Sequence, residues 1–239
     1  MRGCAPLIAV MAVGLSLWGA ESAAPATLDI KAAAQYLEQN EAELEKWATV
    51  KAVKGTDTFA KKETAMQAVA DRIIDYGFVS RFGLGDKWDG TPKEKQERFF
   101  EKMKQLFREF YLEEVFYNKS YEKKYVDKGL RKNYLMGVPE SVFVTTEVQA
   151  TLRKKPVVYE VVYHLYRPAP DRPYLIFDIE LDGVSMVRNY RQQFAKTLKE
   201  STVDDLIRKI DEKLAKKAGK KDRPRQEETP PPAPKGQKK

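Results

Sequence analysis

The chain of 239 residues is long enough for one ordinary domain with terminal extensions, and its 42% hydrophobic content is sufficient for a core. Charged residues make up 33% of the sequence, and the formal net charge of +8 could suggest nucleic acid or an anionic membrane surface as a partner. Residues 218–239 carry seven basic and three acidic residues, so they account for +4 of that excess. The charge therefore does not indicate a nucleic-acid-binding domain, and we expect no nucleic-acid partner.

The N-terminus has the pattern of a secretory signal peptide. Arg2 gives a positive start, an apolar run covers Ala5–Trp18, and small residues follow. We expect residues 1–22 to be the signal peptide, with cleavage after Ser22 or Ala24; an uncleaved N-terminal anchor is the alternative. Cys4, the only cysteine, precedes the run, so cleavage would leave a mature chain with no thiol and no disulfide.

Three segments in the first half predict helices. The first two cover Thr27–Ala48 and Asp57–Gly85, and the second is expected to break near Gly77. The third has Thr91 as a candidate N-cap, with Pro92 at the first helical position and Glu94 completing a capping box. An apolar stripe that begins at Phe99 then follows at helical spacing.

From about Tyr121 the apolar period changes to two, which predicts four strands within residues 122–137, 141–153, 156–167 and 172–183. Two closing helices follow, from Val184 to about Leu198 and from Thr202 to about Ala218. The short turns favour an antiparallel meander, and the order of elements predicts an α+β domain with helices packed on one face of a four-stranded sheet. We expect this domain to cover residues 23–218, and the basic, Pro-rich residues 219–239 to be disordered.

The last predicted strand should present two different faces. The apolar face would hold Leu175, Phe177, Ile179 and Leu181, which alternate with Ile176 and three acidic positions. Asp178, Glu180 and Asp182 would share a solvated face. Three carboxylates on a solvated strand are ordinary, so we expect no metal site.

Motifs that carry catalysis are missing from the sequence. His164 is the only histidine, and neither G-x-S-x-G nor H-E-x-x-H occurs. The glycines of residues 83–90 follow no predicted strand, so this stretch is interpreted as a turn between helices rather than a phosphate-binding loop. We therefore expect no catalytic residues, no cofactor and no enzymatic activity.

Two segments resemble the MlaC, or toluene-tolerance, family. The first pairs an aromatic-Asp strand with an acidic-Gly-Val-Ser step and a helix, through Phe177-Asp178, Asp182-Gly183-Val184-Ser185, Asn189-Tyr190-Arg191 and Phe194. The second carries Arg81, Leu84-Gly85, Trp88, Thr91-Pro92, Phe99 and Phe100. The resemblance covers roughly residues 28–216; Gly83 departs from it, since a β-branched residue is common there.

The resemblance implies a periplasmic lipid-binding shuttle of an ABC-type phospholipid transport system between the outer and inner membranes. Such a protein holds acyl chains in an apolar pocket of a cystatin-like cone. The implied partners are a phospholipid or related apolar lipid, an inner-membrane ABC complex and an outer-membrane lipoprotein complex, and the protein is expected to be a monomer. Because some members are linked to hopanoids or other apolar lipids, the resemblance does not fix the lipid.

Two other functions remain open from the sequence. One is an enzyme on a cystatin-like α+β scaffold that uses Asp178 or His164. The other is a structural or chaperone-like module that holds partner proteins on an apolar face. The candidate pocket lining comes from face and resemblance, since pocket walls and cores use the same residue types. It consists of Phe100, Met103, Phe107, Phe110, Val144, Val161, Tyr163, Phe177, Ile179, Met186 and Tyr190.

Overall fold

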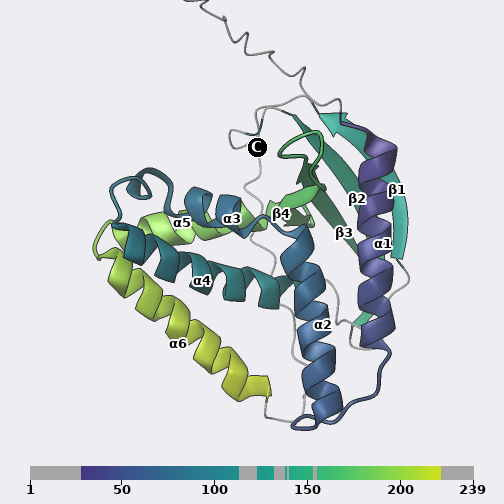
Figure 1. The fold of residues 1–239 in the computed structure, drawn as a ribbon, viewed down its shortest axis with the longest axis horizontal. Helices are drawn as coiled ribbons and strands as arrows, with labels where there is room; N and C mark the ends of the chain where they lie inside the picture. Colours follow the sequence, from purple (N-terminus) through teal and green to yellow (C-terminus); the bar gives the residue numbers. More distant parts are fainter. Residues whose placement is uncertain (1–27, 113–122, 132–137, 139, 153–154, 222–239) are drawn as a thin grey trace, which may run out of the picture.

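The computed structural model describes residues 28–112, 123–131, 138, 140–152 and 155–221 (Figure 1). Its helices are α1 (Ile30–Ala48), α2 (Asp57–Ile73), α3 (Tyr76–Leu84), α4 (Lys93–Phe110), α5 (Met186–Leu198) and α6 (Val203–Lys221), with the short 3₁₀ helix η1 (Gly85–Lys87). Its strands are β1 (Lys123–Arg131), β2 (Ser141–Leu152), β3 (Lys155–Tyr166), β4 (Leu175–Leu181) and β5 (Val184–Ser185). The predicted α+β class is confirmed.

The strands form one sheet in the order β1-β2-β3-β4-β5, and each neighbouring pair is antiparallel. The predicted four-stranded meander is therefore confirmed, with a two-residue fifth strand added beside β4. The pairing of β3 with β4 shifts between His164 and Leu165, because His164 lies opposite Asp178 while Leu165 lies opposite Ile176. This bulge leaves Phe177 as an extra residue on β4.

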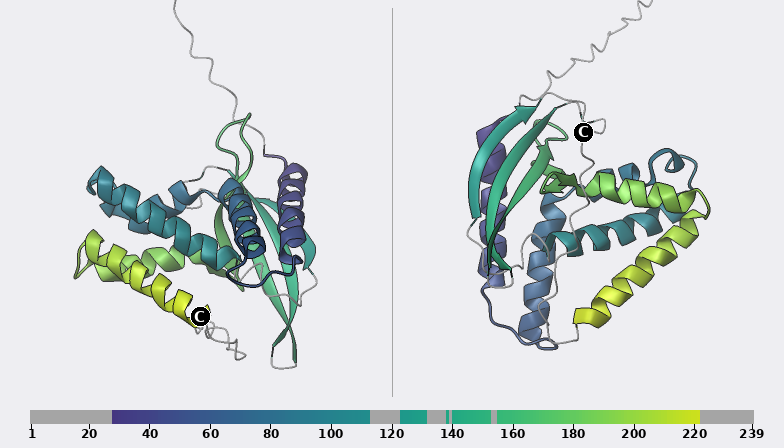
Figure 2. Two further views of the ribbon diagram at one scale, coloured as in Figure 1. Left: turned by 60° about the horizontal axis from the view of Figure 1, so that its bottom comes forward. Right: turned by 180° about the vertical axis from the view of Figure 1, so that it is seen from behind.

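The helices form two groups around the sheet (Figures 1 and 2). Helix α1 crosses one face and packs against β1 and β2, with α2 beside it. Helices α3, α4, α5 and α6 pack against one another and extend away from the sheet near β4. The buried apolar side chains of both groups and of the sheet form one continuous cluster.

The junction between α2 and α3 is fastened to β4. The predicted break falls at Ile74 and Asp75, just before Gly77. The Asp75 N–H donates to the Ile176 carbonyl at 2.8 Å, and the Asp75 carboxylate accepts hydrogen bonds from the Phe78 N–H at 2.8 Å and from the Tyr166 hydroxyl. Asp75 therefore caps α3 and ties it to both neighbouring strands.

The capping box predicted at Thr91 is wrong. Helix α4 begins at Lys93, its N-cap is Pro92, and no side chain caps it. The Thr91 hydroxyl donates instead to the Lys87 carbonyl at 2.6 Å, closing the turn after η1. Since a Thr hydroxyl can bond to nearby carbonyls in a turn, this local bond competes with capping.

The last predicted helix boundaries shift for local reasons. Helix α5 begins at Met186 rather than Val184, because Val184 and Ser185 pair with β4. Asp182 and Gly183 have positive φ angles of 47° and 76°, as the two central residues of a tight hairpin turn do. At the other end, α6 continues to Lys221, three residues into the segment predicted as a tail. The predicted signal peptide and the rest of that tail lie outside the described residues.

Helix α3 ends at Gly85, where the Arg191 side chain of α5 approaches the backbone. Gly85 has φ 54° and ψ −129°, a conformation that a side chain strains. A Cβ at Gly85 would lie 1.8 Å from Arg191 Nη1. That guanidinium donates to the Phe82 carbonyl at 2.9 Å, so it satisfies the C-terminal end of α3.

We predict that Gly85→Ala lowers the free energy of unfolding by about 2–3 kcal/mol, because it adds backbone strain and displaces Arg191 from the Phe82 carbonyl. Gly83→Ala is the matched control, since a Cβ there meets the rings of Phe194 and Phe99 at ordinary distances of 3.5 and 3.8 Å. Within a helix, Ala in place of Gly should stabilise by about 0.5–1 kcal/mol. Thermal unfolding of both variants measures this; equal effects would contradict the assignment.

Candidate functional site

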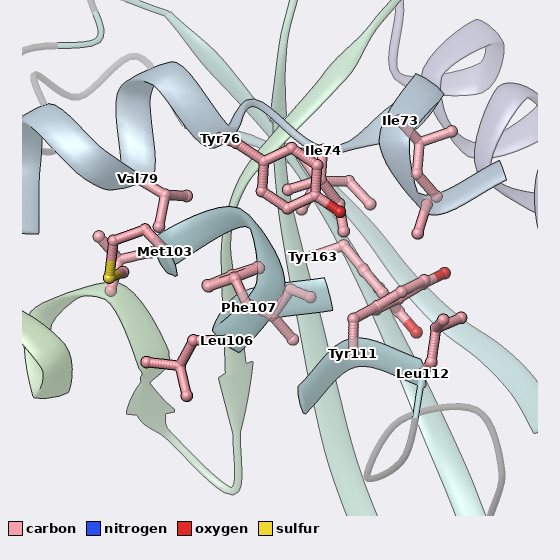
Figure 3. Packing of buried hydrophobic residues seen from close by; sticks show 14 of the residues in the cluster. Ile73, Ile74, Tyr76, Val79, Met103, Leu106, Phe107, Tyr111, Leu112 and Tyr163 are labelled. Carbon is pink, nitrogen blue, oxygen red and sulfur yellow. The ribbon is translucent and has the colours of Figure 1, made fainter. Parts of the chain in front are cut away.

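The largest apolar feature is the buried cluster between sheet and helices, here called the central cluster (Figure 3). Helix α4 contributes Met103 and Phe107, and the strands contribute Val144, Tyr163 and Ile179, each fully hidden from solvent. The spacing of four residues between Met103 and Phe107 places both on the same face of α4. The cluster thus lies between the sheet and the helices, where the family resemblance implies an apolar pocket.

Ten of the eleven predicted lining residues belong to this region. Those within the central cluster are Met103, Phe107, Val144, Val161, Tyr163, Ile179 and Tyr190. Those packed against it and partly buried are Phe100, Phe110 and Met186. The eleventh, Phe177, lies apart from it.

Phe177 is on the opposite side of the sheet, so the predicted alternation of β4 is wrong at this point. Its ring packs edge-on against Phe78, His164 and Tyr166, with centroids 5.2, 5.8 and 5.6 Å away. The bulge at His164 adds one residue to β4, which moves Ile176 rather than Phe177 into the central cluster. Asp178 is likewise buried rather than solvated.

A buried carboxylate enters the central cluster from α1. Glu41 is only 2% exposed, and its Oε1 accepts a hydrogen bond from the Tyr163 hydroxyl at 2.8 Å. Sequence reasoning missed Glu41, although it falls on the apolar face of α1 with Leu37 and Leu44. Polar groups are uncommon inside an apolar cluster, so the Glu41–Tyr163 pair is a candidate functional contact.

The side chains of the central cluster are packed against one another. Between α4 and α5, the Phe107 and Tyr190 rings and the Phe99 and Phe194 rings pack at centroid distances of 6.5 and 5.7 Å. Within α5, Tyr190 stacks on Phe194 at 5.7 Å. Burial raises the pKa of the Tyr76 hydroxyl in the same region, where the charge of Asp71 acts in the same direction. The described side chains of the central cluster are thus closely packed between α4, α5 and the sheet.

Two surface hollows in the described part of the chain lie outside the central cluster. One, on α4, is lined by Glu101, Lys102, Lys104, Gln105 and Arg108. Its basic groups are already engaged, since Lys102 pairs with Asp211 and Lys104 with Asp71. The other surrounds Lys62, whose ammonium donates to the carbonyls of Ala48 and Val50. The hollow on α4 is lined by polar and charged residues and is not suited to an apolar ligand.

The strand-to-helix step after β4 is organised by Asp178. One carboxylate oxygen accepts from the N–H groups of Ile179 and Val187, at 2.8 and 3.1 Å. The other accepts from the Ser185 hydroxyl at 2.5 Å, and that hydroxyl accepts from the Arg188 N–H. Burial raises the pKa of Asp178, while these hydrogen bonds oppose the shift. Asp178 and Ser185 together cap α5, which is a structural role.

The two sequence segments that carry the family resemblance meet in space. Arg191 reaches from α5 to the Phe82 carbonyl beside Gly85, and Phe194 packs on Phe99 of α4. Comparison with known families identifies the one described as MlaC protein over residues 44–212, more than half of the chain. The chain belongs to the MlaC family.

Comparison with solved structures finds the same fold in a phospholipid-binding protein from Ralstonia solanacearum, whose structure is in complex with a phospholipid. The two share 18% sequence identity with a TM-score of 0.57, covering 78% of this chain and 98% of that one. No curated protein matches this MlaC-family chain. Among its described helices, none combines the length and apolar character needed to cross a membrane.

We predict that Asp178→Ala lowers the free energy of unfolding by about 2–4 kcal/mol, because the buried N–H of Val187 and the Ser185 hydroxyl lose their acceptor. Ser185→Ala should cost only about 1 kcal/mol, as the loss of one N-cap does. Denaturant unfolding of both variants provides the measurement. A larger loss in Ser185→Ala would show that Asp178 does not organise this step.

Proposed function

We propose that this chain is a periplasmic lipid shuttle that carries a phospholipid or related apolar lipid with its acyl chains between the sheet and the helices. The observation that carries the proposal is membership of the MlaC family together with an apolar cluster that runs continuously from the sheet into α4 and α5. The phospholipid complex of the Ralstonia solanacearum protein, which has the same fold, supports the same class of ligand.

The cost of exposing acyl chains to water requires that a carrier enclose them almost completely. Exposing an acyl chain to water costs about 0.8 kcal/mol per CH₂, so two typical chains cost on the order of 20 kcal/mol or more. A carrier must cover nearly all of that surface with side chains. The central cluster offers a continuous set of aromatic and aliphatic groups from β2, β3, β4, α4 and α5 for this purpose.

Tyr163 and Glu41 provide the polar contact of the proposed site. Their hydrogen bond lies within the central cluster, so a separated cleft would present a hydroxyl and a carboxylate on otherwise apolar walls. Polar groups placed this way orient a ligand without adding much binding energy. The remaining wall is the predicted set without Phe177, which faces the other side of the sheet.

The setting of the shuttle follows from the family and from the N-terminal sequence. Export by the signal peptide of residues 1–22 would place the protein between the two membranes. Its proposed partners are an outer-membrane lipoprotein complex and an inner-membrane ABC complex. We propose no catalytic step: the carboxylate of Asp178, one of the two residues on which an enzyme would depend, accepts three hydrogen bonds that hold it at the start of α5.

Native mass spectrometry of the protein purified from its own cells tests the proposal directly. We expect about one bound lipid per chain, identified by its mass after release. A chain that is empty under conditions that preserve non-covalent complexes would contradict a lipid shuttle and favour the protein-holding alternative.

The place of the lipid is tested by two valines of the same strand. Val161 is 2% exposed in the central cluster, whereas Val158 is 59% exposed on β3. We predict that a photo-reactive side chain at position 161 crosslinks to lipid and that one at position 158 does not. Val161→Asp should lower co-purified lipid several-fold, while Val158→Asp should leave it unchanged. Equal crosslinking at both positions would place the lipid elsewhere.

A further inference from the structure

Three side chains that could bind a metal ion meet on the side of the sheet away from the central cluster. His164 of β3 lies directly opposite Asp178 of β4, and Glu180 is two residues further along β4. One donor atom from each of the three lies within 4.8 Å of the others. The imidazole Nε2 of His164 is 3.1 Å from Oε1 of Glu180.

The imidazole of His164 is held in place but is not hydrogen-bonded within the described part of the chain. The residue is 1% exposed, and neither ring nitrogen has a hydrogen-bond partner there. Phe143 packs edge-on at a centroid distance of 4.3 Å and Phe177 at 5.8 Å. Nε2 lies close to the Glu180 carboxylate but makes no hydrogen bond of acceptable geometry with it. Because buried polar groups are normally bonded, a ligand shared by the imidazole and the carboxylate would satisfy Nε2.

The Asp178 carboxylate is also fixed, yet it retains coordinating capacity. An ionised carboxylate offers about four lone-pair sites, and three donors use three of them here. Those three bonds fix its orientation, as the outer contacts of metal ligands commonly do. Asp178 is fully buried, so a cation at this place would offset the cost of burying its carboxylate.

We propose that His164, Asp178 and Glu180 form a binding site for one divalent transition-metal ion, with Zn²⁺ the best fit. Zn²⁺ takes imidazole and carboxylate ligands at about 2.0–2.2 Å and is commonly bound by three side chains and a water. Ca²⁺ and Mg²⁺ prefer oxygen ligands alone, so the imidazole disfavours them. The Glu180 side chain is 25% exposed, which leaves that side open for the ion and its water.

A metal ion here would join β3 and β4 beside the start of α5. Asp178 already caps that helix, so coordination would strengthen the strand-to-helix step. The site lies on the other side of the sheet from the proposed lipid cleft. The Zn²⁺ proposal is therefore independent of the lipid-binding proposal. A protein that carries lipid but binds no Zn²⁺ would contradict the metal site alone.

The test is a Zn²⁺ titration of the chelator-treated full chain against a competing fluorescent chelator. We expect one tight site per chain, at least about tenfold weaker in Glu180→Gln and lost in His164→Asn. Glu160→Gln is the matched control, since Glu160 is an exposed carboxylate on β3 of the same sheet. Because His164 is the only histidine, tight binding that survives its replacement cannot come from this site.

Two readouts on the unaltered chain keep the test decisive if a variant does not fold. Co²⁺ should give the visible absorption bands of a four-coordinate site, and excess Zn²⁺ should raise the unfolding temperature by about 5 °C or more. Mg²⁺ at the same concentration should do neither. Binding no tighter than that of Glu180→Gln, or no Zn²⁺-dependent rise in unfolding temperature, would overturn the proposal.

Discussion

The fold depends on the way β4 turns into α5, and a single buried carboxylate fixes that turn. Asp178 accepts hydrogen bonds from the Val187 N–H and the Ser185 hydroxyl. Burial raises the pKa of its carboxyl, and these hydrogen bonds oppose the shift. The Asp182–Gly183 turn reverses the chain first, and its positive φ angles require residues that tolerate them. This sequence pattern therefore encodes one structural unit, in which the aromatic-Asp strand is followed by the acidic-Gly hairpin turn and the Val-Ser start of the helix.

The same unit explains why two distant segments carry the family resemblance. With the direction of α5 set by this turn, the Arg191 guanidinium donates to the Phe82 carbonyl at the end of α3. It fits there because Gly85 has no side chain, and Phe194 packs on Phe99. Helices α3, α4 and α5 are thereby joined by contacts that do not involve the interior of the sheet. The helix group can behave as one body whose inner surface is the α4 and α5 side of the central cluster.

The sequence predicted the order and type of the elements well, because apolar periods of 3.6 and two are long and regular in this chain. It failed where one residue changes the pattern. At Phe177 the bulge adds a residue, which reverses the face of every earlier position on β4 relative to strict alternation. At Thr91 a hydroxyl made a turn bond rather than a cap, and period alone cannot distinguish these choices. Glu41 was missed because acidic residues are normally exposed on helices, and its partner Tyr163 is 122 positions away.

The hydrogen bonds that link the helix group to β4 indicate how a lipid-carrying chain of this fold would open. Both described connections between the helix group and the rest of the domain are tied to β4: Asp75 bonds to the Ile176 carbonyl, and Asp178 caps α5. Separation along β4 would break hydrogen bonds at both places. Separation of α4 from α2 and the sheet parts apolar contacts together with the ion pairs that Asp71 of α2 makes with Lys104 and Arg108, which are partly exposed and can be replaced by bonds to water. Apolar surface exposed by opening is covered again when acyl chains enter, but broken buried hydrogen bonds are not replaced by a hydrocarbon. The favoured motion therefore keeps β4 as the hinge side and separates α4 from α2 and the sheet.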